Sequence, residues 1–390
     1  MALDRKALDL CVDELSQELS ALSRKIHAHP ELCFEEHQAA AWLGECLERE
    51  LGAQVERGVG GLATAFRARV GKGGGPKIAI LAEYDALPDI GHACGHNLIA
   101  GSAVGAFLAL AKYSPQLDGT VEIIGTPAEE GGGGKIKLMK AGVFEGVDAA
   151  MMFHPFDRDI LAHSALCSMR IAMKYEGVPA HAAAAPFAGK SALTACLETF
   201  RLIDSQRVHF RDGVRVHGIV TNGGQAVNVI VEHAASEFTL RAQSSEELER
   251  IKAIVMRCAR GAALACDVEV SFQEKIGYRE MKNNLTMARR FGAALEALGR
   301  NARETDTRVG AGSTDMGDLS LHLPSIHPYL AICDEGESLC HEHRFADCAA
   351  SERGMSTMLV AAKAMARTTL DLLEDPKLLG EVRREFEAAR

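Results

Sequence analysis

The segment from Glu83 to Asn97 carries the side chains best suited to chemistry, directly after an apolar, strand-like run. Cys94 and His96 are two residues apart. At this spacing the two side chains would point to different faces of a helix, but in a loop they can converge on one ion. Thiolate with imidazole suits Zn²⁺ or a similar transition metal. The segment therefore predicts half of a metal site in a loop, although an isolated pair is more often a buried thiol beside solvated histidines.

Further candidate ligands follow other predicted strands. Glu129 and Glu130 come after one apolar run, and His154 comes after another. Because ligands of an open α/β sheet bind beyond the carboxyl ends of its strands, we expect these side chains to gather at one edge with the Cys-Gly-His segment. In a loop that begins with proline and ends in glycine, one of two adjacent carboxylates can bind a metal while the other faces its water. A solvated acidic turn remains the alternative for this pair.

Three other features are less specific. His341 can supply a ligand from the C-terminal part of the chain, and His343 is the competing choice. His181 lies in a predicted loop, where a lone histidine is usually a surface residue. The glycine run that begins at Gly131 allows close backbone approach, but the lysine after it lacks the following Ser or Thr of a phosphate-binding loop.

Length and composition narrow the class of protein. A chain of 390 residues with 47% hydrophobic and 25% charged residues is typical of a soluble globular protein with two domains. A formal net charge of -10 argues against binding to nucleic acid. No secretory signal or long apolar run is present, so we expect a cytoplasmic protein that does not associate with membranes. The 11 cysteines, without a C-x-x-C pair, fit reduced thiols.

Helical and strand-like segments alternate along the first part of the chain. This alternation predicts an α/β fold with a mostly parallel, doubly wound sheet. The predicted order is helix 4–28, a second helix that ends near Gly52, strands 60–70 and 77–82, helix 98–113, strand 121–125, helix 135–141 and strand 149–153.

The pattern changes near Ser168. From there the chain reads strand, helix, strand, strand, helix, strand, which is the order of the split ferredoxin-like unit. We therefore expect an inserted α+β domain at residues 168–283. Residues 1–167 and 284–390 would then form the catalytic domain.

Several motifs together resemble the dinuclear metallopeptidase family of aminoacylase, carnosinase and carboxypeptidase G. They are similar in particular to the amidohydrolase branch with a Cys-Gly-His ligand pair, and within it to β-alanyl-lysine dipeptidase and aminobenzoyl-glutamate hydrolase members. The match spans nearly the whole chain. The motifs are His29-Pro30-Glu31-Leu32, Phe34-Glu35-Glu36, Asp85-Ala86-Leu87-Pro88, His92-Ala93-Cys94-Gly95-His96-Asn97, Pro127-Ala128-Glu129-Glu130-Gly131, Phe153-His154-Pro155, Ala180-His181-Ala182, Asn228-Val229-Ile230 and Ser313-Thr314-Asp315-Met316-Gly317.

The resemblance implies a role for each matching residue. Glu129 falls on the general acid/base position, and Asp85 on the carboxylate that orients a ligand. His181 matches the inserted-domain histidine that steadies the oxyanion in the partner's active site of a homodimer. Asn228 and Arg241 match positions that hold the substrate's carboxylate end. Two divalent metal ions per subunit, Zn or Mn, are implied, with ligands at Cys94, His96, Glu130, His154 and His341.

The implied activity is metal-dependent hydrolysis of an amide bond in a small N-acyl amino acid or dipeptide-like substrate. The inserted domain would serve as a lid and as the contact of a homodimer. Two alternatives remain at this stage. One is an amidase that acts on a non-peptide or xenobiotic amide, and the other is a non-catalytic metal-binding subunit that kept the fold.

Overall fold

The computed structural model describes residues 3–306 and 312–389. The chain divides into two compact units, which we call unit 1 (Met1–Ser164 and Met281–Arg390) and unit 2 (Ala165–Glu280). None of the helices in the described part of the chain is long and apolar enough to cross a membrane.

Unit 1 is built on a mixed sheet whose described strands have the order β1-β2-β4-β3-β5-β11. Strands β4, β3, β5 and β11 are parallel to one another, and β2 pairs antiparallel with β4. Every residue of β3 after Lys77 is buried, as expected for a central strand with both faces covered. The predicted α/β class with a mostly parallel sheet is confirmed. The strands are β1 (Glu56–Arg57), β2 (Phe66–Val70), β3 (Lys77–Ala82), β4 (Thr120–Gly125), β5 (Ala149–Met151) and β11 (Ser325–Ile326), with β6 (His154–Phe156) and β12 (Tyr329–Ala331) in a separate parallel pair.

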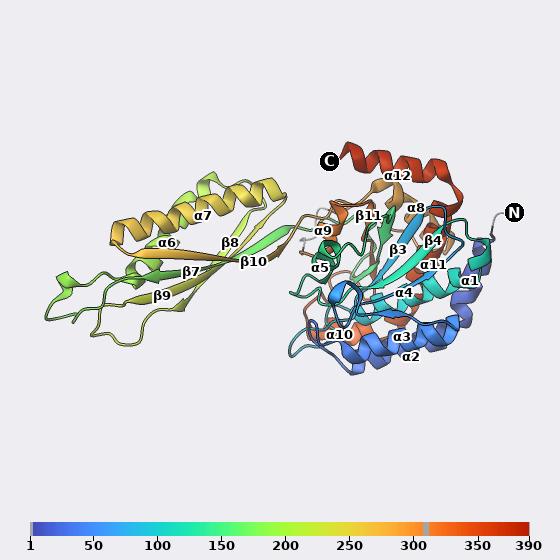
Figure 1. Cartoon of the computed structure of the whole chain (residues 1–390), viewed down its shortest axis with the longest axis horizontal. Coiled ribbons are helices and arrows are strands. Elements are labelled where there is room, and N and C mark those ends of the chain that lie inside the picture. The colour runs from blue at the N-terminus through green and yellow to red at the C-terminus, as the bar shows by residue number, and fades with distance from the viewer. Residues whose placement is uncertain (1–2, 307–311, 390) are drawn as a thin grey trace. The chain divides into compact units, whose positions relative to one another are not determined.

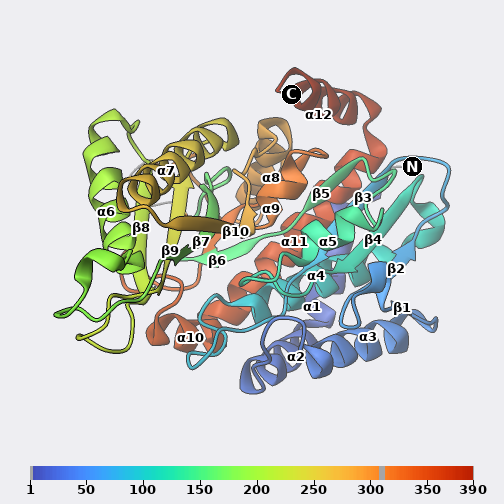
Figure 2. The ribbon, with the colours of Figure 1, turned by 60° about the vertical axis from the view of Figure 1, so that its left-hand side comes forward.

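Helix α4 is the central helix of unit 1, and it is buried from His96 to Leu110. It packs against β3 and lies beside α11 (Figure 2). Gly101 permits this close approach, because a Cβ there would lie 2.3 Å from Sδ of Met358 in α11. The helices of unit 1 are α1 (Arg5–Glu14), α2 (Ser16–Ala28), α3 (His37–Leu51), α4 (His96–Ala111), α5 (Gly134–Lys140), α8 (Leu285–Ala297), α9 (Met316–Ser320), α10 (His343–Ala350), α11 (Glu352–Glu374) and α12 (Pro376–Ala388).

Unit 2 has the predicted order strand, helix, strand, strand, helix, strand, and the expected separate ferredoxin-like domain is confirmed. Its antiparallel sheet has the order β10-β7-β9-β8, and α6 and α7 pack together over one face (Figure 1). Alternate residues of β7 face the core, among them Ile171 and Met173. The elements are β7 (Cys167–Glu176), α6 (Ala192–Gln206), β8 (Arg215–Asn222), β9 (His233–Ala242), α7 (Ser245–Cys266) and β10 (Glu269–Tyr278).

Two predicted elements of unit 1 differ most from the structure. The single helix predicted for residues 4–28 is divided at Leu15, whose ψ of -2° departs from helical geometry. The strand predicted for residues 60–70 begins only at Phe66. Gly60 and Gly61 have φ values of 62° and 79°, so the preceding residues form a turn that a strand cannot contain.

Candidate metal centre

Cys94 and His96 lie at the junction between the loop after β3 and helix α4. The predicted loop ends at Gly95, and His96 is already the first residue of α4. Gly95 has a φ of 74°, and a Cβ at this position would lie 2.5 Å from Cγ of Pro155. The glycine between the two candidate ligands is therefore needed both for the turn and for close packing against the segment that carries His154.

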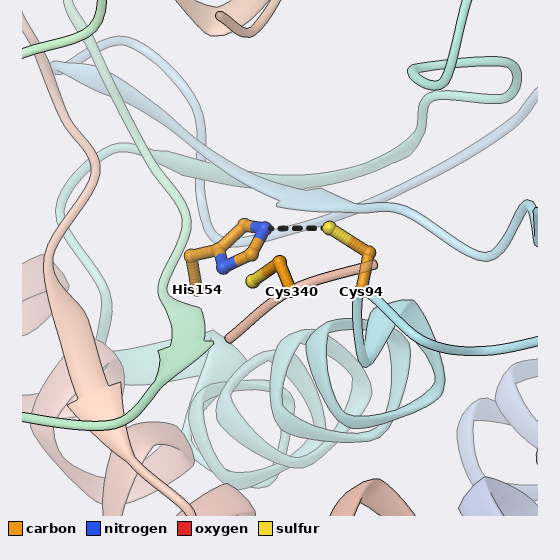
Figure 3. A group of neighbouring side chains, drawn as sticks. All are labelled: Cys94, His154 and Cys340. Atoms are coloured by element: carbon orange, nitrogen blue, oxygen red, sulfur yellow. Dashed lines mark hydrogen bonds between the residues drawn. The ribbon is translucent and has the colours of Figure 1, made fainter. Parts of the chain in front are cut away.

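Two groups of potential ligand atoms share the Cys94 thiol. Cys94, His96 and Glu130 form one group. Cys94, His154 and Cys340 form the other (Figure 3), and within each group all ligand atoms lie within 4.8 Å of one another. The Cys340 thiol, burial and the Glu130 carboxylate raise the pKa of Cys94 well above its usual value. A bound cation would favour the thiolate form of Cys94.

Asp85 connects two members of the first group. Its Oδ1 lies 3.0 Å from Nδ1 of His96, and its Oδ2 accepts the backbone N–H of Glu130 at 2.9 Å. Burial alone would raise the pKa of Asp85, but the His96 ring and the Glu130 N–H outweigh burial and lower it. Because Nδ1 of His96 donates to Asp85, the ring presents Nε2 as its ligand nitrogen.

Three buried polar atoms around His96 have no hydrogen-bond partner among the residues that the structure describes: Nε2 of His96, Oε1 of Glu130 and Oε2 of Glu83. Nε2 lies 3.5 Å from this Glu83 oxygen and 3.9 Å from the Glu130 oxygen. Burial lowers the pKa of His96, but Asp85, Glu83 and Glu130 outweigh burial and raise it well above its usual value. Because unpaired buried polar atoms are unfavourable, these residues fit a divalent cation, which would displace the proton from the ring.

His154 presents an imidazole nitrogen to Cys94. Its Nδ1 donates to the carbonyl of Pro155 at 2.7 Å, and its Nε2 lies 3.5 Å from Sγ of Cys94. Burial and the neighbouring His96 lower the pKa of His154 to about 3. The ring also stacks on Tyr329, with the ring centroids 5.1 Å apart. A neutral imidazole with a fixed tautomer is the form that binds metals.

Cys340 and His341 reach the same region from the C-terminal part of the chain. His341 has a φ of 73°, uncommon for a residue other than glycine, and its N–H donates to the carbonyl of Ala93 at 2.8 Å. Its Nε2 lies 3.4 Å from Oε2 of Glu130, although the side chain is 56% exposed. His343, the competing candidate, is exposed at the start of α10. The geometry therefore brings His341 to the ligand cluster.

Glu36 holds the loop that carries Glu129 and Glu130. Ala128 has a φ of 63°, a conformation costly for alanine, and its N–H donates to Oε1 of Glu36 at 2.9 Å. Glu129 is 7% exposed. Burial, followed by the carboxylates of Glu83 and Glu130, raises the pKa of Glu129 well above its usual value. A carboxyl group in this state can both take up and return a proton.

Lys135 forms a fully buried ion triad beside the ligand cluster. Its Nζ donates to Oε1 of Glu83 and, at 2.6 Å, to Oδ1 of Asp315. Its backbone N–H donates to Oδ2 of Asp315 at 3.0 Å. Burial lowers the pKa of Lys135, but Asp315, Glu83 and Glu129 outweigh burial and raise it. The triad fixes the start of α5 and, through it, the loop that carries Glu129.

His181 and Asn228 lie on neighbouring loops of unit 2. The N–H of Ala182 donates to the carbonyl of Asn228 at 3.0 Å, and both predicted site residues are exposed. Nδ1 of His181 accepts the backbone N–H groups of Ala183 and Ala184 at 3.2 and 3.1 Å. Since Nδ1 is an acceptor, Nε2 carries the proton and is a hydrogen-bond donor.

Arg241 lies in a different part of unit 2. It stands near the end of β9, paired with Ser168 of β7 and Arg215 of β8, whereas Asn228 precedes the start of β9. At about 3.3 Å per residue, the stretch of β9 between its start and Arg241 is roughly 25 Å long. Burial and the nearby Arg170 lower the pKa of Arg241. Within a single chain, Arg241 and Asn228 therefore lie at different ends of β9, and their role in holding the carboxylate end of a substrate stays a prediction.

Sequence reasoning missed four residues of this region. Glu36, Lys135 and Asp315 are buried and charged, and only the fold reveals that they hold the acidic loop. Cys340 joins the second ligand group. A sequence signal existed for Cys340, since a thiol directly precedes a predicted ligand, and for Glu36 and Asp315, which lie in motifs that carry the resemblance.

Comparisons with known proteins agree with this geometry. Residues 79–368 match the family described as peptidase family M20/M25/M40. The chain is 37% identical over 400 residues to the Xaa-Arg dipeptidase of Mus musculus, an alignment that covers 98% of this chain and 92% of that protein. It is 30% identical over 455 residues to one of the subunits of p-aminobenzoyl-glutamate hydrolase from Escherichia coli (strain K12), an alignment that covers 97% of this chain and 94% of that protein.

A solved structure supports the fold. A dinuclear metal-binding peptidase of the M20 family from Bacillus subtilis superposes with a TM-score of 0.73 at 23% identity, covering 93% of this chain and 99% of that chain. The predicted resemblance is confirmed by the family match and by the full-length relatives. With its matching fold and its clustered thiol, imidazole and carboxylate groups, this chain belongs to peptidase family M20/M25/M40.

Proposed function

We propose that this hydrolase cleaves the amide bond of a dipeptide or N-acyl amino acid. The observation that carries the proposal is the buried Glu129 carboxyl group beside two ligand groups that share Cys94. The names of the full-length relatives, Xaa-Arg dipeptidase and p-aminobenzoyl-glutamate hydrolase, support this substrate class. A non-catalytic role is disfavoured, because a binding site has no use for a buried acid/base with a raised pKa.

Two divalent ions, Zn²⁺ or Mn²⁺, are the proposed cofactors. The residues that would hold them are Cys94, His96, Glu130, His154 and His341. Bound there, the ions would lower the pKa of water and polarise the amide carbonyl. Asp85 orients the His96 ring through Nδ1, and the carbonyl of Pro155 does the same for His154.

Glu129 performs the proton transfers in this proposal. Its carboxylate takes a proton from the attacking water, and the resulting carboxylic acid returns that proton to the leaving amine. Glu36 and the Lys135 triad keep the Glu129 loop in one conformation, so the carboxyl group needs no rearrangement between the two transfers.

Unit 2 is proposed to form the contact of a homodimer. Strand β8 is an edge of its sheet and exposes Ile219 and Val220. The loops beside His181 expose Phe187 by 89% and Val227 by 103%. Exposed apolar residues along an edge strand favour pairing with another chain. In such a dimer, the Nε2–H of His181 would donate to the oxyanion in the partner's active site, and Asn228 would contact the substrate.

The chain is proposed to act in a reducing compartment such as the cytoplasm. Its 11 cysteines are all free in the structure, which fits a compartment that keeps thiols reduced.

The substitution Glu129→Gln tests the assignment. We expect amide hydrolysis to fall below detection across a panel of dipeptides and N-acyl amino acids, while bound metal, measured by mass spectrometry, stays at the wild-type level. The exposed Glu35→Gln variant is the control and should keep full activity. Activity of Glu129→Gln near the wild-type rate would overturn the assignment. Wild-type turnover confined to non-peptide amides would replace the proposed substrate class with a xenobiotic amidase.

A further inference from the structure

The second ligand group contains a thiol that the five proposed ligands do not include. We propose that Cys340 binds metal together with Cys94 and His154, which makes this position a two-thiolate site selective for Zn²⁺. The inference rests on the proposed metal-dependent function and refines it. The other position, with Cys94, His96 and Glu130, has one thiolate and would accept Mn²⁺ as well.

The geometry supports three ligands that converge. Sγ of Cys94, Nε2 of His154 and Sγ of Cys340 lie within 4.8 Å of one another, and the three side chains point toward a common region (Figure 3). Nδ1 of His154 is already used by the carbonyl of Pro155, so the nitrogen that faces the thiols carries the lone pair. Each of the three residues therefore directs a metal-binding atom toward this common region.

The backbone fixes Cys340 in this place. The next residue, His341, has a φ of 73° and donates its N–H to the carbonyl of Ala93, the neighbour of Cys94. This hydrogen bond attaches the segment that carries one thiol to the segment that carries the other. The contact from Sγ of Cys340 to the carbonyl of Pro155 is 4.0 Å long and weak for a hydrogen bond, so little is lost when the thiol binds an ion.

Ligand chemistry then distinguishes the two positions. Two thiolates and one imidazole are a typical set for Zn²⁺, with a fourth position open to water. Mn²⁺ prefers carboxylate oxygen and binds thiolate-rich sites weakly. A set of one thiolate, one imidazole and one carboxylate should have an intermediate preference for Zn²⁺ over Mn²⁺. The sharing of Cys94 therefore joins two positions of unequal selectivity in one centre.

Sulfur counting on the wild-type protein tests the proposal directly. With one equivalent of Zn²⁺ added to the reduced apoprotein, X-ray absorption at the zinc edge should report two sulfur neighbours at about 2.3 Å. One sulfur neighbour would overturn the assignment of Cys340 while leaving metal binding intact. No bound zinc at all would overturn the proposed function together with this inference.

A variant series gives a second readout. With one equivalent of Co²⁺, the thiolate-to-cobalt absorption band of Cys340→Ser should fall to about half of the wild-type intensity. Zn²⁺ affinity should fall about tenfold or more, with Mn²⁺ affinity unchanged. The control is Cys266→Ser, a partly buried thiol of α7 in unit 2, which should match wild type. Equal bands and equal Zn²⁺ affinity in Cys340→Ser and wild type would contradict the proposal. If Cys340→Ser does not fold, the sulfur count decides alone.

Discussion

The candidate site residues of unit 1 and unit 2 differ in how the protein holds them. In unit 1, Cys94, His96 and His154 are at most 8% exposed and lie within reach of one another. In unit 2, His181 and Asn228 are exposed on loops whose backbones pair. The folding of unit 1 therefore assembles its cluster, whereas the role proposed for the exposed pair would require contact with another molecule.

Because of this difference, substitutions in the two units should affect protein stability and enzymatic activity differently. Buried charges in unit 1 are held by partners of opposite charge, so the loss of one partner should affect folding and metal binding together. Substitution of an exposed residue in unit 2 should leave folding unchanged and affect turnover alone. The following experiments test this difference.

The largest effect is expected for Lys135→Met. This substitution leaves the carboxylates of Glu83 and Asp315 buried without their cation, which should cost about 3 to 5 kcal/mol of unfolding free energy. Urea unfolding followed by the fluorescence of Trp42, the 1 tryptophan of the sequence and a residue of α3 in unit 1, measures the loss. Lys72→Met, which breaks an exposed pair with Asp118, should cost far less, because solvent screens this pair. Equal effects of the two substitutions would contradict the proposed support by the triad.

The next largest effect is expected for His181→Ala. Loss of an oxyanion donor should lower kcat by about 10²- to 10³-fold. Because His181 is exposed, the urea midpoint and the metal content should not change. If His181 acts in the partner's active site, mixing His181→Ala with Glu129→Gln should restore part of the activity through hybrid dimers. Dimers that exchange protomers without any recovery of activity would exclude action across the dimer.

A smaller effect is expected for Asp85→Asn. The asparagine carbonyl cannot accept from both Nδ1 of His96 and the N–H of Glu130, because these two groups contact different oxygens of Asp85. Metal affinity should fall about 10- to 100-fold, measured by competition with a chelating dye. Asp89→Asn, an exposed carboxylate of the same loop, is the matched control. Unchanged affinity in Asp85→Asn would remove Asp85 from its proposed role.

The smallest effect concerns the pH dependence of stability. Burial raises the pKa of Glu36 from 4.5 to about 7. The folded protein thus keeps a proton that the unfolded chain releases, so the contribution of Glu36 to stability is full below pH 4.5 and is lost as the pH rises through about 7. Glu36→Gln should remove this decrease of the unfolding free energy with pH. The slope of the decrease corresponds to at most about one proton per molecule. Glu35→Gln, an exposed neighbour, should keep it. A wild-type stability that rises over this pH range, with the same slope in Glu36→Gln, would contradict the assignment.

The local pattern of the chain predicted most of the fold. Apolar runs located β3 and β4 to within a residue and predicted the order of the elements of unit 2, because buried strands need continuous or alternating apolar side chains. The errors lie where backbone geometry overrides composition, at Leu15 and at the two glycines before β2. Helix α4 begins earlier than predicted, at His96, because Gly95 supplies the turn that starts it.

The sequence by itself determined which residue types end the strands of unit 1, and hence that thiol, imidazole and carboxylate groups collect at one edge. Only the tertiary structure decided which of them share a position. Cys340 meets Cys94 and His154, and Lys135 meets Asp315, across separations that spacing along the chain cannot encode. The physical reason is that a buried charge or thiol is tolerated only where distant segments bring its partners, and those partners are chosen by packing.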